Sequence, residues 1–213
     1  MLRRLLTLTA IVWLATGAQA GGEELLEDAD IRAAFVAELQ GLESFAADFR
    51  QVVRDADGNV LEEATGDFRL ARPDRFRWRY DEPLPREIIA DGTDIWLYDI
   101  ELDQVTVRPF AGIIEQTPAG ILAGDLELLD AYTIGGQAAD DDLLVMLQPA
   151  SNRPDFTDIR VRFVNGQLAG MQLTDQFGQT TAIVFSAVDR NPDIDPAVFQ
   201  FSLPANADLI DER

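Results

Sequence analysis

Alternation of apolar and polar residues, interrupted by short turn sequences, is the feature of this chain that most restricts its fold. Side chains of a strand point to its two faces with a period of two, and Asp-Gly or Asn-Gly pairs favour tight hairpin turns. The pattern predicts about eleven strands, at residues 45–53, 66–71, 75–80, 86–92, 94–99, 104–109, 131–136, 143–148, 158–166, 167–175 and 180–188. Strands joined mostly by short turns form a large antiparallel sheet, which at this size curls into a barrel or half-barrel.

Two segments have helical rather than strand character. Residues 23–40 place apolar side chains at spacings of three and four, begin with acidic residues and end before Gly41, which predicts an amphipathic helix. Residues 110–129 are apolar and lie between strands, with Thr117 and Pro118 suited to the start of a helix. We expect both segments to cover the curved sheet.

The second helical segment is a candidate lid. Its glycines lower helix stability by about 1 kcal/mol each, which suits a cover that can move. An ordinary core helix fits the periodicity equally well. The side chains expected to line the lid are Ile113, Ile114, Ile121 and Leu122.

The first twenty residues have the pattern of a secretory signal peptide. Arg3 and Arg4 precede an apolar run of about ten residues, and small Ala18 and Ala20 follow it. A membrane-spanning helix needs about 20 residues, so an uncleaved anchor is the weaker alternative. We expect residues 21–213 to form one soluble, exported, monomeric domain in the periplasm, without the cysteine that a lipid anchor would require.

The missing residue types exclude several kinds of chemistry. Histidine, cysteine and lysine are all absent, which excludes disulfides, His-based nucleophilic catalysis and metal sites that depend on imidazole or thiolate. Without the signal peptide, 15 arginines stand against 38 acidic residues, a net charge of -23. Such a field repels phosphate backbones and favours basic protein partners, so nucleic-acid binding is not expected.

The acidic motifs do not predict a metal site or an active site. The sequence DADGN at residues 55–59 is too short for a calcium loop and is typical of a hairpin turn, and ADDD at residues 139–142 is typical of a solvated loop. Carboxylates are abundant enough for a glycosidase, but nothing in the sequence places two of them in one cleft. We therefore expect no cofactor, no metal and no enzymatic activity.

Large aromatic residues recur on neighbouring predicted strands. Such residues at alternating positions are usually core, so a filled barrel is one interpretation. The other is a hydrophobic cavity for acyl chains. The residues proposed to line this cavity are Phe49, Phe68, Phe76, Trp78, Trp96 and Tyr98.

Several blocks of the sequence, in order and spacing, resemble the LolA-type outer-membrane lipoprotein carriers. They include SFAADFRQ, GDFRLARPDRFRWRYDEP, IIADGTDIWLYDIELDQVTV, TPAGILAG and DPAVFQFSLPANADLID. The resemblance implies an α+β fold, mainly β: an unclosed antiparallel barrel with a helical lid over a hydrophobic cavity. It also implies a carrier that accepts triacylated lipoproteins from an inner-membrane ABC transporter and delivers them to an outer-membrane receptor.

The same resemblance assigns roles to two residues of the RP motif. By position, Arg72 is the arginine that bonds to the lid and holds it shut in the empty protein. Phe76 corresponds to the aromatic residue that is important for lipoprotein retention and transfer. A regulatory protein that senses lipid or lipoprotein on the same scaffold is the alternative, although such proteins usually carry another domain.

The RPDRFRWRY stretch also separates into two faces. In an extended strand, Arg75, Arg77 and Arg79 point to one side and the intervening aromatic residues to the other. We expect the three arginines to form a solvated outer face paired with carboxylates.

Overall fold

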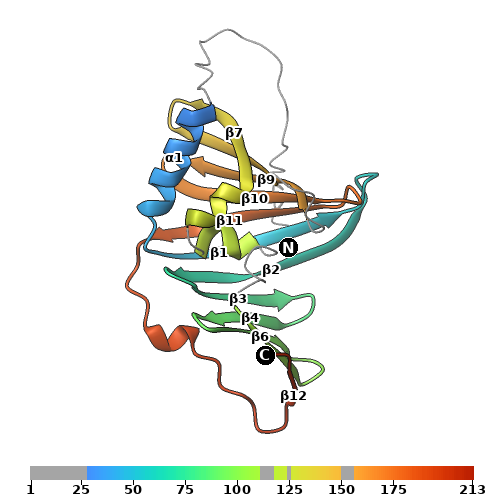
Figure 1. Ribbon diagram of the computed structural model, residues 1–213. Coiled ribbons are helices and arrows are strands. Elements are labelled where there is room, and N and C mark those ends of the chain that lie inside the picture. Colours follow the sequence, from blue (N-terminus) through green and yellow to red (C-terminus); the bar gives the residue numbers. More distant parts are fainter. Residues whose placement is uncertain (1–27, 111–117, 124–125, 150–155) are drawn as a thin grey trace, which may run out of the picture.

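One twelve-stranded sheet dominates the computed structural model, which describes residues 28–110, 118–123, 126–149 and 156–213 (Figure 1). The strands are β1 (Ser44–Arg54), β2 (Val60–Ala71), β3 (Arg75–Glu82), β4 (Arg86–Asp91), β5 (Asp94–Asp99), β6 (Gln104–Pro109), β7 (Tyr132–Ala139), β8 (Asp142–Pro149), β9 (Phe156–Val164), β10 (Gln167–Asp175), β11 (Thr180–Arg190) and β12 (Asp208–Asp211). Their order is β12-β6-β5-β4-β3-β2-β1-β11-β10-β9-β8-β7. Within the described residues β7 and β12 are the two edges, so the sheet is unclosed.

The eleven predicted strands are all present as β1 to β11, and the predicted fold class is confirmed. All pairs among these eleven strands are antiparallel. The twelfth strand, β12, was not predicted. It lies parallel to β6, with Leu209 opposite Val105, and all four of its residues are exposed. A four-residue segment without a buried face gives no alternating pattern to detect.

The helix α1 (Asp28–Gln40) crosses the sheet at its β7 end (Figure 1). Its buried side chains are Ile31, Phe35 and Leu39, one per turn along a single stripe. The apolar spacing also predicts Ala29 and Ala33 on this stripe, and that detail is wrong, because both are exposed. The residues before Asp28 in the predicted helix lie outside the described residues.

A glycine allows α1 to pack closely on β7. A Cβ atom at Gly136 would lie 3.1 Å from Ile31 Cγ2 and 2.1 Å from the backbone oxygen of Leu144. A Cβ atom cannot lie 2.1 Å from a backbone oxygen, and 3.1 Å from Ile31 is already a tight contact. Glycine is therefore required where the helix meets the sheet.

Three short helices complete the described chain: α2 (Pro118–Ala123) and the 3-10 helices η2 (Leu126–Ala131) and η3 (Pro196–Phe199). The buried residues of α1, α2 and η2 belong to one hydrophobic core with the sheet. We call the side of the sheet that they contact the covered face. The C-terminal segment with η3 packs on β3 and β4 from the opposite side, the outer face.

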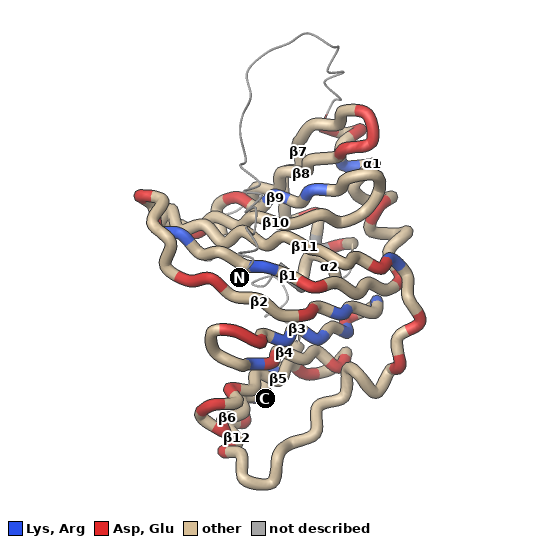
Figure 2. The backbone as a smooth tube through the Cα atoms, turned by 180° about the vertical axis from the view of Figure 1, so that it is seen from behind, with Lys and Arg blue, Asp and Glu red and all other residues tan. Residues whose placement is uncertain are grey.

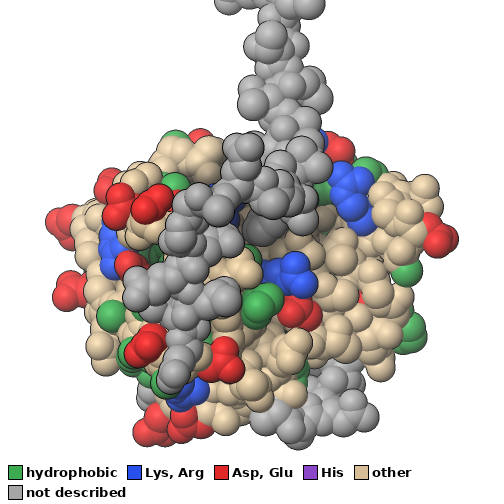
Figure 3. All heavy atoms as spheres, turned by 90° about the horizontal axis from the view of Figure 1, so that it is seen from above, with side chains coloured by type: hydrophobic (Ala, Val, Ile, Leu, Met, Phe, Trp, Pro, Cys, Tyr) green, Lys and Arg blue, Asp and Glu red, His purple; other side chains and the backbone are tan. Residues whose placement is uncertain are grey.

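The arginines of β3 lie on the outer face, as predicted, since they alternate with its buried aromatic residues and Arg77 Nη1 donates to the Val198 carbonyl of the C-terminal segment. Figure 2 shows the positions of basic and acidic residues along the chain. Arg77 Nη2 donates to Glu87 Oε1 at 2.8 Å, and Arg79 Nε lies 2.8 Å from Asp67 Oδ2. The two carboxylates are partly covered, while each arginine stays in reach of solvent. Ion pairs at a protein surface contribute about 0–1 kcal/mol each. The arginines of β3 are therefore ordinary surface residues paired with carboxylates. Other carboxylates are visible around the periphery of the molecule in Figure 3.

Candidate functional site

A cluster of seven aromatic side chains fills the covered face where β1, β2, β3 and β11 lie side by side. The alternation of each strand sends these rings to the same side of the sheet, and the register brings them together. None of the seven is more than 7% exposed. This aromatic cluster consists of Phe45, Phe49, Phe68, Phe76, Trp78, Tyr80 and Phe185.

The rings of the cluster contact one another directly. Trp78 lies at its centre, with ring centroids 4.5 Å from Phe68 and 5.2 Å from Phe49. Aromatic pairs at such distances contribute about 0.5–1.5 kcal/mol beyond the area they bury. In this state the cluster is filled by its own side chains and by the helices that cover it.

Two polar side chains, Gln51 of β1 and Arg86 of β4, contact Tyr80 of the aromatic cluster. The Tyr80 hydroxyl donates to Gln51 Oε1 at 3.1 Å, and Gln51 is itself only 7% exposed. The guanidinium carbon of Arg86 lies 4.1 Å from the centroid of the Tyr80 ring. Burial raises the pKa of the Tyr80 phenol, and the charge of Arg86 opposes the rise only in part. Tyr80 is therefore a neutral hydrogen-bond donor at any physiological pH.

Four of the six predicted cavity residues come together in this cluster. They are Phe49, Phe68, Phe76 and Trp78. The predicted site residues do not include Phe45, Tyr80 and Phe185, although Tyr80 lies between two polar residues and the other two each have one polar neighbour. The missing information is the strand order, because β11 comes last among the long strands but pairs with β1.

The prediction that Trp96 and Tyr98 share this face is wrong. In the register of β4 and β5, Ile88 and Leu97 are partners on the covered face, whereas Trp96 pairs with Ile89 on the outer face. Trp96 stacks on Phe201 of the C-terminal segment, with ring centroids 5.1 Å apart, and Tyr98 contacts the same ring. Both residues are therefore part of a second apolar layer that the C-terminal segment covers.

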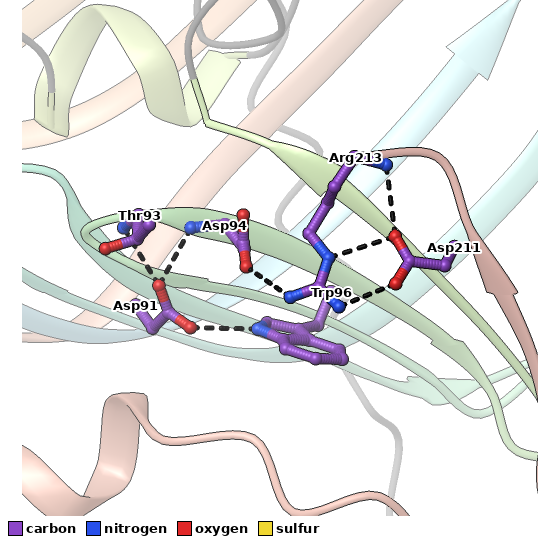
Figure 4. A network of polar contacts seen from close by, with 6 residues as sticks. All are labelled: Asp91, Thr93, Asp94, Trp96, Asp211 and Arg213. Atoms are coloured by element: carbon purple, nitrogen blue, oxygen red, sulfur yellow. Dashed lines mark hydrogen bonds and ion pairs between the residues drawn. The ribbon is translucent and has the colours of Figure 1, made fainter.

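A polar network fixes the end of the C-terminal segment beside Trp96 (Figure 4). Asp91 accepts hydrogen bonds from Trp96 Nε1 and from the backbone N–H groups of Thr93 and Asp94, all at 2.9 Å. Burial alone would raise the pKa of Asp91, but these hydrogen bonds outweigh it and lower the pKa. At the other end of the network, hydrogen bonds from Arg213 lower the pKa of Asp211 to about 2.

This network should loosen in acid. Carboxylates whose pKa is lowered by folding stabilise the fold above their ordinary pKa of 3.8, and that contribution is lost as the pH falls towards about 2. Trp96 donates to Asp91, whose pKa is lowered, so we expect the indole N–H resonance of Trp96 to titrate below pH 3.8 in a heteronuclear NMR experiment, while that of Trp78 stays in place as an internal reference. A midpoint at or above pH 3.8 would contradict the assignment.

The cover over the aromatic cluster comes from α2 and the end of α1. Of the predicted lid residues, Ile121 and Leu122 are buried in the common core, 8% and 0% exposed. Ile113 and Ile114 lie outside the described residues. The backbone N–H of Asp74, just before β3, donates to the carbonyl of Ala123 at the end of α2, at 3.1 Å.

Arg72 joins the RP motif to the other helix of the cover. Its Nη1 donates to the backbone carbonyl of Leu39, in the last turn of α1, at 3.2 Å. Its own backbone N–H donates to Glu43 in the connection that follows α1. A cation at a helix C-terminus is favoured by the free carbonyls and by the helix dipole. The guanidinium is therefore placed to hold α1 in position over the sheet.

A hollow of about 230 Å³ opens beside the aromatic cluster, over β4, β5 and β6. Its apolar part comes from Ile88 and Leu97 on the covered face, and Arg86 lines it on the side of Tyr80. The hollow thus connects solvent with the polar edge of the cluster.

Residues 40–202 match the protein family described as outer membrane lipoprotein carrier protein LolA. The chain belongs to this family. The outer-membrane lipoprotein carrier protein of Chromohalobacter salexigens is 36% identical over 200 residues, covering 93% of this chain and 91% of that one. That of Dechloromonas aromatica is 32% identical over 213 residues, covering 100% and 98%. Among solved structures, an uncharacterized conserved protein from Thermus thermophilus shares the fold, with a TM-score of 0.54 at 11% identity over 87% of this chain and 100% of that one.

The match to the LolA family contains the complete aromatic cluster and leaves β12 outside. The resemblance inferred from the sequence blocks is thereby confirmed. The roles that it assigns to Arg72 and Phe76 remain predictions. Within the described part of the chain, no helix has the length and apolar character needed to cross a bilayer, and no group of three carboxylates is arranged to hold a metal ion.

Proposed function

We propose that this protein is a periplasmic chaperone for lipoproteins. It accepts triacylated lipoproteins from an inner-membrane ABC transporter, shields their acyl chains, and delivers them to an outer-membrane receptor. The observation that carries the proposal is the aromatic cluster, a large apolar surface buried under short helices rather than under a second sheet. Membership of the LolA family and the names of its relatives support the same function.

The energetics of the cargo define what the site must do. Burial of a methylene group contributes about 0.8 kcal/mol, so three acyl chains with some 40 methylenes carry roughly 30 kcal/mol of transfer free energy. Free passage through water is therefore excluded. When the helices move away from the aromatic cluster, apolar surface is exposed. The acyl chains of the cargo would then contact the rings in place of the helices and bury this surface again.

The cover is held by few contacts, which suits exchange. The described α2 has only six residues, and helices this short are not stable in isolation. Arg72 fixes the end of α1, and Asp74 fixes the end of α2. A hydrogen bond of this kind contributes about 0.5–3 kcal/mol, little enough for a partner protein to break.

Mass spectrometry of the protein recovered from the periplasm tests this function. The full chain, expressed in a bacterium with an outer membrane, is expected to copurify with acylated peptides or lipids under native conditions. As a matched control, Phe177→Glu changes a phenylalanine that is 78% exposed at the tip of the β10–β11 hairpin, and should retain the cargo. Repeated recovery of empty protein from cells that overproduce a lipoprotein would argue against a carrier.

A further inference from the structure

The indole nitrogen of Trp78 is a buried polar atom without a hydrogen-bond partner among the described residues. The side chain is only 3% exposed, and its Nε1–H finds no acceptor in that part of the chain. The groups around it are the rings of Phe49, Phe68 and Tyr80. Buried polar groups in native proteins are nearly always paired, because leaving one unpaired opposes folding. A tryptophan here therefore calls for an acceptor that the described part of the chain does not provide.

The register of β3 and β4 indicates where such an acceptor would come from. Trp78 lies opposite Ile88 in the register of β3 and β4, and Ile88 lines the hollow. The next pair along these strands is Tyr80 and Arg86. The Nε atom of Arg86 is a second buried nitrogen with no acceptor among the described residues. Two buried N–H donors, Trp78 Nε1 and Arg86 Nε, thus lie on neighbouring strand pairs beside the hollow, without an acceptor among the described residues.

The chemistry of these donors selects one class of ligand. Both unpaired groups are N–H donors, and the Tyr80 hydroxyl already donates to Gln51. A ligand that satisfies them needs oxygen acceptors at one end and apolar chains at the other. Acylated cargo has this form, because ester and amide carbonyls join its apolar chains to the rest of the molecule.

We propose that Trp78 Nε1–H donates a hydrogen bond to an ester or amide carbonyl of the acylated cargo. This inference rests on the proposed carrier function and adds an orientation to it. The carbonyl lies between the aromatic cluster and the hollow, the acyl chains extend towards Phe68 and Phe185, and the polar end of the cargo leaves through the hollow beside Arg86. Trp78 is thus a positioning residue that sets the depth of the lipid.

A comparison of two lipids tests the hydrogen bond. Dioctanoylglycerol has two ester carbonyls, whereas the matched dioctyl ether has none. The measured quantity is the dissociation constant of the ether divided by that of the ester. The mature protein should prefer the ester, and this ratio should be about tenfold lower in Trp78→Phe, a difference of about 1.4 kcal/mol. Comparing the ratio between two proteins cancels the difference in hydration between the lipids.

A second variant separates the donor from the shape of the ring. Benzothienylalanine at position 78 keeps the bicyclic ring and replaces the N–H by sulfur, so it should reproduce the loss of ester preference without a large cavity. In wild-type protein, the indole N–H resonance of Trp78 should move downfield with the ester and not with the ether.

The outcomes are distinct. An unchanged ratio in both variants, with both lipids bound, would overturn the hydrogen bond and leave the carrier function in place. Binding of neither lipid by wild-type protein would contradict the carrier function and this inference together. A lowered ratio in Trp78→Phe but not in the benzothienyl variant would also overturn it, since ring shape would then be the cause.

Discussion

Replacing Phe76 by glutamate should abolish cargo binding and destabilise the protein severely. Phe76 is 1% exposed and packs with Phe68 in the aromatic cluster, so the substitution removes a buried ring and places a carboxyl group in its site. Loss of a buried phenylalanine ring is worth about 3–5 kcal/mol, and burial of the carboxyl adds to it. Domains of this size have about 5–15 kcal/mol of stability. Urea unfolding and the amount of acylated cargo that copurifies measure the two effects.

The exposed Phe177 provides the matched control for this prediction. Phe177→Glu makes the same chemical change at a hairpin tip and should shift the unfolding free energy by less than about 0.5 kcal/mol. Phe76→Leu keeps an apolar side chain in the cluster and should retain part of the cargo. Normal stability and normal cargo in Phe76→Glu would show that Phe76 lies outside the binding surface.

The strands were predictable because their pattern is local. Most of β1 to β11 have their own alternation or a short apolar run such as that of β4, and most are bounded by turn residues, so no knowledge of neighbouring strands was needed. The sequence of β3 even separates Arg77 from Phe76 and Trp78 by face. The twelfth strand escaped detection because it pairs at an edge and buries none of its side chains.

The site was less predictable because it depends on register between strands. A tryptophan on β5 looks the same as a tryptophan on β3, yet Trp96 faces the C-terminal segment and Trp78 faces the helices. The turns before and after β5 determine its register, and the register decides whether the odd-numbered or the even-numbered side chains of β5 point to the covered face. The lack of an acceptor for the Trp78 indole among the described residues is likewise a property of its surroundings, which the sequence does not display.

Arg72→Leu should let the protein accept cargo and impair its release. In the proposed latch, the bond from the guanidinium to the Leu39 carbonyl stabilises the closed state, and hydrogen bonds to charged groups contribute about 1.5–3 kcal/mol. Without it, the balance between open and closed protein should move towards the open form by roughly tenfold to a hundredfold. Because apparent affinity rises with the population of the binding-competent form, the variant should hold its cargo more tightly.

Transfer between membranes distinguishes this effect from misfolding. Release of a lipoprotein from inner-membrane vesicles to the variant should proceed normally, while delivery from the loaded variant to outer-membrane vesicles should fall by about tenfold or more, in line with the shift in the opening equilibrium. Arg69→Leu, which removes an exposed arginine three residues earlier on β2, is the control and should deliver normally. Arg72→Lys keeps the charge but loses the planar fork, so partial delivery is expected. Full delivery by Arg72→Leu would exclude the latch, because the closed state would then owe nothing to the bond between the RP motif and α1.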